Sequence, residues 1–139
     1  MSLLRNHAAA LATFTDLTIV YTHPLSLSPA TLTADGGVDQ YLTSWILAWD
    51  AHAIAADPLR IFDANIFYPH RNTLAFSENL ISTAILVLPA ARLGGSAMLV
   101  QNLAVLLSFV LAAYAAYLLA HELVRSRAAA LVAGFIFGF

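Results

Sequence analysis

The stretch that decides the fold is ADGGVDQYLTSWILAWDAHAIAADPLRIFDANIFYPHRNTLAFSEN, residues 34–79, a polar and aromatic insert between two apolar blocks. It contains five of the six Asp and both Trp of the chain, whereas the sequence after it is mostly Leu, Ala, Val, Ile and Phe. We therefore expect the insert to carry the function and the apolar blocks to hold it at one face of a membrane.

The composition indicates an integral membrane protein. Hydrophobic residues make up 60% of the 139 residues and charged residues only 10%, against about 25% charged in ordinary globular domains. The net charge of −2, with no Lys, leaves no basic surface for nucleic acid, and the lack of Cys excludes disulfides and thiolate metal sites. A chain of this length has room for two or three spans and one large loop, so we expect it to be part of a larger protein.

Apolar patterning predicts an all-α architecture. Tyr41, Trp45 and Trp49 recur every four residues, which is typical of the apolar face of an amphipathic helix at the membrane surface, and Pro58 ends that helix. The apolar residues 80–93 are fewer than the about 20 that a crossing takes. We expect transmembrane helices with an extracytoplasmic loop that carries two juxtamembrane amphipathic helices.

These patterns divide the chain into a series of parts. The expected order is a first span at 8–25, an outer loop at 34–79 with an interfacial helix at 39–57, a juxtamembrane helix at 79–93, a second span at 97–120 and the start of a third span at 128–139.

The Arg positions predict the orientation of these spans. Arg5 precedes the first span, whereas Arg125 and Arg127 follow the second, and short loops rich in Arg stay cytoplasmic. With 79–93 outside the hydrocarbon, both Arg-bearing ends lie inside and the acidic insert faces outward. Arg5 followed by an apolar run also fits a secretory signal peptide, so that alternative stays open.

Asp39 is the first candidate for chemistry because it opens the aromatic helix directly after the predicted turn Gly36–Gly37. A carboxylate there can act as a general base, and it can equally cap the helix by accepting backbone N–H bonds. Asp50 and Asp57 are expected on the solvated face of the same helix. Asp39 and Asp50 are 11 residues apart, which is about 16 Å along a helix, so they cannot both coordinate the same ion.

Further polar residues lie in or beside the loop that follows. Asp63, His70 and Glu78 are of the types that bind divalent metals or act as bases, although their spacing is not diagnostic of a metal site. His52, on the aromatic helix, is expected to be a packed interfacial histidine. Asp16, within the first span, is either a functional carboxylate or a buried group that hydrogen-bonds to a neighbouring helix.

The sequence Asp39-Gln40-Tyr41 and the order of the parts resemble the amino-terminal region of GT-C type membrane glycosyltransferases. These polyprenyl-phosphate-sugar-dependent enzymes include the dolichyl-phosphate-mannose and aminoarabinose transferases, whose first outer loop begins with an Asp-Glu-Tyr-like motif that contains a catalytic Asp. The strings WILAWDAHAI, FDANIFYPH and LAFSENL also look like those of a bacterial group of large multi-spanning proteins related to these enzymes. Gln40 departs from the motif, which argues against a metal bound by adjacent carboxylates.

The resemblance implies the amino-terminal part of a multi-pass bacterial inner-membrane glycosyltransferase that transfers a sugar from a lipid-linked donor on the extracytoplasmic side. The resemblance implies that Asp39 is catalytic. We add Glu78 as a second candidate catalytic carboxylate, and the candidate substrate-binding residues are Tyr41, Trp45, Trp49 and His70. The implied partners are membrane lipid, the polyprenyl-phosphate sugar and the remaining spans of a larger protein, while a divalent metal is left open. Family members have many more spans, so we do not expect this chain to be active alone. The alternative is a non-catalytic membrane assembly or transport subunit whose outer loop binds a partner.

Overall fold

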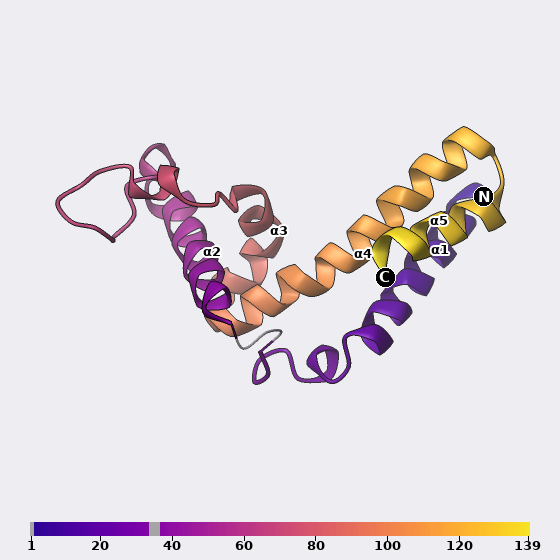
Figure 1. Ribbon diagram of the computed structural model, residues 1–139, viewed down its shortest axis with the longest axis horizontal. Coiled ribbons are helices and arrows are strands. Elements are labelled where there is room, and N and C mark those ends of the chain that lie inside the picture. The colour runs from indigo at the N-terminus through magenta and orange to yellow at the C-terminus, as the bar shows by residue number, and fades with distance from the viewer. Residues whose placement is uncertain (1, 34–36) are drawn as a thin grey trace. The chain divides into compact units, whose positions relative to one another are not determined.

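The computed structural model describes residues 2–33 and 37–139, and the regular elements within these ranges are all helical (Figure 1). The five α-helices among them are α1 (Ser2–Tyr21), α2 (Val38–Ala56), α3 (Ile81–Arg92), α4 (Ala97–Val124) and α5 (Arg127–Gly138), and three short 3-10 turns are η1 (Leu25–Leu27), η2 (Pro58–Arg60) and η3 (Thr73–Phe76). The predicted all-α class is therefore confirmed. Gly36 of the predicted turn lies outside the described residues.

The chain forms two compact units. Unit 1 consists of the residues up to 28 together with 105–139, and unit 2 consists of 29–104, so that α4 contributes its first two turns to unit 2 and the rest to unit 1. Among the described residues, α4 is the one helix that is long and apolar enough to cross a bilayer. The crossings predicted for α1 and α5 stay predictions.

The first helix differs most from its predicted bounds. It begins at Ser2 and ends at Tyr21, whereas the apolar block suggested 8–25. Pro24 accounts for the earlier end, because a proline disfavours the helical conformation at the residue before it, here His23. Helices α2, α3 and α5 begin and end within two residues of the predicted positions, and α4 continues four residues further than predicted.

Three Thr residues of α1, and Thr22 directly after it, form hydrogen bonds to carbonyl oxygens of the helix. The hydroxyls of Thr13, Thr15, Thr18 and Thr22 each donate to the carbonyl oxygen four residues earlier, at 2.7–2.9 Å. A hydroxyl that is bonded in this way costs little in apolar surroundings. This explains how a block diluted by Thr still forms one continuous helix.

In unit 1, small residues on α5 allow close helix packing. Ala130, Gly134 and Gly138 recur every four residues and are buried. A Cβ atom at Gly134 would overlap the ring of Phe14 and lie 2.7 Å from the carbonyl oxygen of Ala113. This spacing of small residues is typical of helices that pack closely within membranes.

In unit 2, α2 is buried along two adjacent arcs. On one arc, Leu47 packs with residues of α3 and of the first turns of α4, among them Val87 and Val100. On the other arc, Ile46 packs with Leu74 and other residues of the segment that follows α2. The segment between α2 and α3 therefore folds back onto α2 and covers part of it.

This folding back covers part of the aromatic face of α2. Trp45 and Trp49 are half-buried against the cluster around Ile46, and the Nε1–H of Trp49 donates to the carbonyl oxygen of Ile61 at 2.7 Å. The position of this face at the membrane surface stays a prediction, while the chain itself covers part of both rings. Tyr41 alone of the three is largely exposed, at 74%.

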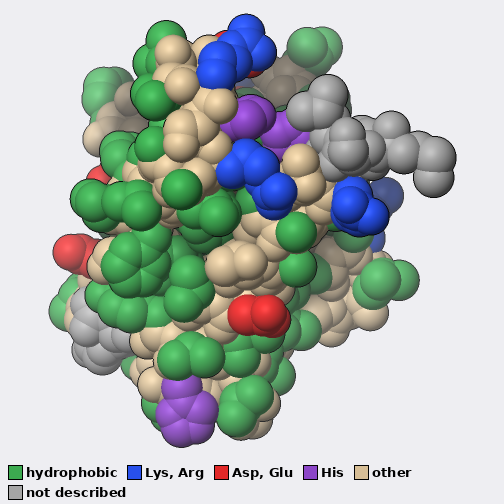
Figure 2. All heavy atoms as spheres, turned by 90° about the vertical axis from the view of Figure 1, so that its right-hand side faces the viewer, with side chains coloured by type: hydrophobic (Ala, Val, Ile, Leu, Met, Phe, Trp, Pro, Cys, Tyr) green, Lys and Arg blue, Asp and Glu red, His purple; other side chains and the backbone are tan. Residues whose placement is uncertain are grey.

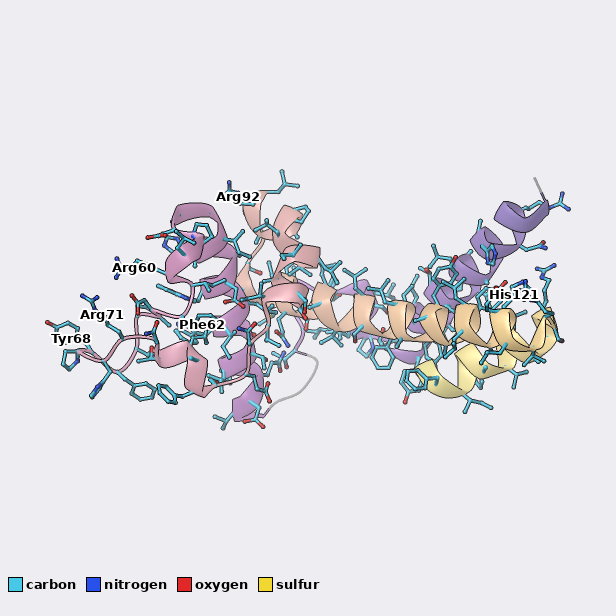
Figure 3. All side chains as sticks on the ribbon, turned by 90° about the horizontal axis from the view of Figure 1, so that it is seen from above. Arg60, Phe62, Tyr68, Arg71, Arg92 and His121 are labelled. Carbon is cyan, nitrogen blue, oxygen red and sulfur yellow. The ribbon has the colours of Figure 1, made fainter. Side chains whose placement is uncertain are left out.

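The loop between η2 and η3 is fixed at its base by Asp63. Its carboxylate accepts the backbone N–H of Asn72 at 2.8 Å and the Nε–H of Arg60 at 3.0 Å. These hydrogen bonds hold the pKa of Asp63 below its usual range, and the one from Asn72 has the larger effect. Tyr68 and Arg71 lie at the outer end of the loop, away from this base (Figure 3). The base of the loop is therefore fixed by the side chain of Asp63.

A tight turn connects α3 to α4. Gly94 adopts a positive φ of 88°, which glycine tolerates better than other residues, and its N–H donates to the carbonyl oxygen of Ala91 at 3.2 Å. Ser96 then accepts the N–H of Leu99 at 3.2 Å on its side-chain oxygen, which satisfies one of the free donors at the start of α4. The turn brings the end of α3 next to the beginning of α4.

Candidate functional site

The two predicted catalytic carboxylates are exposed in separate parts of unit 2. Asp39 lies in the first turn of α2, and Glu78 lies between η3 and α3. The N-cap of α2 is Gly37, so the alternative in which Asp39 caps this helix is wrong. Asp16 is also exposed, on α1, and both alternatives for it stay open.

The segment that leads towards Asp39 is fastened to α4 by Asn102. This side chain is fully buried, and its Nδ2 donates to the carbonyl oxygens of Pro29 at 2.7 Å and of Leu32 at 2.6 Å. One side-chain amide thus uses both N–H groups to hold a segment about 70 residues away in the sequence. The chain is anchored to α4 shortly before α2 begins.

Asp50 is an ionisable residue whose position differs from the sequence prediction. It is 0% exposed, and neither carboxylate oxygen accepts a hydrogen bond from the described part of the chain. Burial raises its pKa to about 6. The prediction of a solvated-face residue is wrong, because Asp50 follows Ile46 and Leu47 by four and three residues and shares their buried side of α2. That spacing was a signal in the sequence that could have identified it. Asp57 is exposed, as predicted.

Two hollows border the second half of α2, and His52 lines both. The larger one, which we call the alanine hollow, measures about 380 Å³ and lies between α2, the end of α3 and the start of α4. The smaller one measures about 190 Å³. Alanines make up most of the larger hollow, with His52 and Arg92 as its ionisable residues, whereas the smaller is lined by Trp49, His52, Asp57, Arg60 and Asp63, among others. His52 is exposed, with its ring 5.8 Å from that of Trp49, so it is not the packed histidine that was predicted.

The predicted site residues are not gathered in one place. His70 lines a third hollow, of about 410 Å³, on the exposed loop together with Phe67 and Phe76. Asp39 precedes His52 by 13 residues, which is about 20 Å along α2. Among the described residues no three His, Asp or Glu side chains gather as metal ligands, so Asp63, His70 and Glu78 form no such set.

Unit 1 contains a polar cluster that the sequence did not suggest. The rings of His7, Tyr117 and His121 lie 5.7 to 5.8 Å apart in each pair. The Nδ1 atoms of both histidines and the Oη atom of Tyr117 are buried without a hydrogen-bond partner among the described residues. Figure 2, which looks onto this end of unit 1, shows Arg and His side chains together above a face that is largely apolar. The cluster joins α1 to α4 near the end that carries the Arg residues.

Comparisons of the chain with protein-family models, with curated proteins and with solved structures find no match. The resemblance to GT-C type glycosyltransferases therefore rests on the sequence strings and the order of parts given above.

Proposed function

We propose that this chain is the amino-terminal part of a multi-spanning glycosyltransferase of the bacterial inner membrane, which transfers a sugar from a polyprenyl-phosphate donor on the extracytoplasmic side. The observation that supports this proposal most is the position of Asp39. Its carboxylate is exposed on the first turn of α2, and the segment before that helix is fastened to α4 by Asn102. A base needs such a combination of an accessible side chain and a fixed backbone.

In the proposed reaction, Asp39 takes the proton of an acceptor hydroxyl. The acceptor oxygen forms a bond to the anomeric carbon of the sugar, the bond from that carbon to the phosphate oxygen breaks, and polyprenyl phosphate leaves. Tyr41, two residues after Asp39 on another face of the same turn and 74% exposed, offers a ring on which a sugar can stack. Glu78, the other candidate catalytic residue, is exposed in a separate part of unit 2 and is given no role in this step.

The alternative function is that of a membrane assembly subunit whose outer loop binds a partner. The specific observation in its favour is the segment 67–76, where Phe67 and Tyr68 of the loop and Phe76 at the end of η3 are 73%, 96% and 91% exposed. Exposed aromatic rings of this size are typical of surfaces that bind another molecule.

The test of the glycosyltransferase proposal is Asp39→Asn in the full-length protein in isolated membranes, with labelled mannose, glucose and aminoarabinose polyprenyl phosphates as donors. We expect transfer to fall at least about 100-fold, because a general base contributes that much or more. Asp57→Asn, which removes an exposed carboxylate at the other end of the same helix, is the matched control and should leave transfer unchanged. Transfer at the wild-type rate by Asp39→Asn would refute the role of Asp39.

A further inference from the structure

We infer that the alanine hollow is a second binding site, separate from Asp39, which takes the phosphate headgroup of a membrane lipid. Two cationic or hydrogen-bond-donating side chains line it from different helices, His52 from α2 and Arg92 from the end of α3 (Figure 3 labels Arg92). A guanidinium offers a planar set of N–H donors that fits two phosphate oxygens, and an imidazole offers an N–H in either protonation state. Neither side chain forms an ion pair with the described residues.

The other polar contribution to the hollow is the beginning of α4. Gly95 and Ala97 line the cavity, and Ala97 is the first residue of this 28-residue helix. The N-terminus of a helix carries a partial positive charge and unsatisfied N–H groups, which favour an anion. No Asp or Glu is among the described residues that line this hollow, whereas the smaller hollow next to it contains Asp57 and Asp63. Of the two cavities, the alanine hollow is thus the one that suits an anion.

The position of the hollow on α4 indicates a lipid as the source of the phosphate. The uncharged residues 97–120 of α4 extend for about 36 Å, against a hydrocarbon core of about 30 Å, so Ala97 lies within about 6 Å of the edge of that core. Lipid phosphates occupy this layer. The alanine walls, which include Ala48, Ala55 and Ala91, leave space for the glycerol and the upper acyl chain of a lipid. A free phosphate ion would leave these apolar walls uncovered.

This site is distinct from the proposed catalytic position. His52 follows Asp39 by 13 residues, so about 20 Å of helix separates them. A phosphate held by His52 and Arg92 is too far from Asp39 to be the group that leaves during sugar transfer. We therefore assign the bound lipid an anchoring role, in which it fastens α2 and α3 to the membrane surface beside α4.

The inference can be tested with the full chain purified in a neutral detergent and titrated with phosphatidylglycerol. Trp49 reports binding through its fluorescence, because its ring lies 5.8 Å from that of His52. We expect a saturable change, and an apparent Kd at least about tenfold higher for Arg92→Gln, as expected when a charge-assisted hydrogen bond is lost. His52→Ala should weaken binding as well. Arg71→Gln, which removes the same charge from the exposed loop, is the matched control and should bind as the wild type does.

Two further titrations identify the source of the phosphate. Diacylglycerol, which has the acyl chains without the phosphate, should give no saturable change, and inorganic phosphate should bind far more weakly than phosphatidylglycerol. If diacylglycerol bound as tightly as phosphatidylglycerol, the proposed contact to the phosphate would be refuted. If inorganic phosphate bound more tightly than phosphatidylglycerol, the proposal that the ligand is a lipid would be refuted. Wild-type affinity for phosphatidylglycerol in Arg92→Gln would overturn the site itself. These binding assays do not depend on Asp39, so their failure is distinguishable from a failure of the proposed transferase activity.

Discussion

The buried carboxyl group of Asp50 should make unit 2 less stable as the pH rises. Burial raises its pKa from the usual 3.8 to about 6, whereas in the unfolded chain the group regains its ordinary pKa. At a pH between these two pKa values, the folded state binds more protons than the unfolded state does. The stabilisation is therefore complete below about pH 4 and is lost as the pH rises through about 6. With about 1.4 kcal/mol for each pKa unit, the total loss is about 3 kcal/mol.

Asp50→Asn tests this reasoning because the amide is similar in size and carries no charge. Both Trp residues lie in α2, so the thermal unfolding of unit 2 can be followed by their fluorescence. About 1 kcal/mol of this is already lost at pH 4.5, so about 2 kcal/mol is lost between pH 4.5 and pH 8. For a unit of this size that loss corresponds to a Tm that is about 8 °C or more lower at pH 8 than at pH 4.5. We expect this difference in the wild type and in the control Asp57→Asn, and its absence in Asp50→Asn. The same difference in Asp50→Asn, or no difference in the wild type, would refute the reasoning.

Three further predictions concern the packing and the loop. Asn102→Asp removes both N–H donors from the carbonyl oxygens that they hold, and should lower the free energy of unfolding of unit 2 by about 2 to 4 kcal/mol in the same fluorescence assay. Gly134→Leu places a side chain where the ring of Phe14 lies, and should destabilise unit 1 by about 1 to 3 kcal/mol, as measured by loss of helical circular dichroism on heating. Asp63→Ala releases the base of the loop, and should speed tryptic cleavage after Arg71, as measured by the appearance of fragments.

Each of these substitutions has a control at an exposed position of the same unit. Asn65→Asp, Val132→Leu and Asp57→Ala change similar side chains without touching the packed contacts. The interpretation of Asn102 fails if its variant unfolds as Asn65→Asp does. The interpretation of Gly134 fails if Gly134→Leu lowers the stability of unit 1 no more than Val132→Leu does. The interpretation of Asp63 fails if trypsin cleaves Asp63→Ala at the wild-type rate.

Local signals were sufficient to predict the bounds of α2 and α3 to within two residues. Pro58 disfavours helix at the residue before it, and α2 ends at Ala56. The glycines at 94 and 95 separate α3 from α4, between the ranges 79–93 and 97–120 that were predicted to be helical. Such signals act between neighbouring residues, so they need no knowledge of the tertiary structure.

The surroundings of α2 could not be predicted in the same way. Helical periodicity shows which residues share a face, but not how many neighbours cover that face. The segment 61–74 folds back over Trp49, so the aromatic face is a packing surface, and Asp50 is enclosed at its edge. The alanine hollow depends likewise on the turn at Gly94, which brings together His52 and Arg92 from distant parts of the sequence.

The most direct test of the account is the side of the membrane on which unit 2 lies. Because the chain has no Cys, single cysteines can be placed at Val38 and Tyr68, which are 83% and 96% exposed, and at Val124, at the end of α4. With a membrane-impermeant maleimide in intact cells, we predict labelling at Val38 and Tyr68, and labelling at Val124 only after lysis. Protection of both unit 2 positions in intact cells, with reaction only after lysis, would contradict the account.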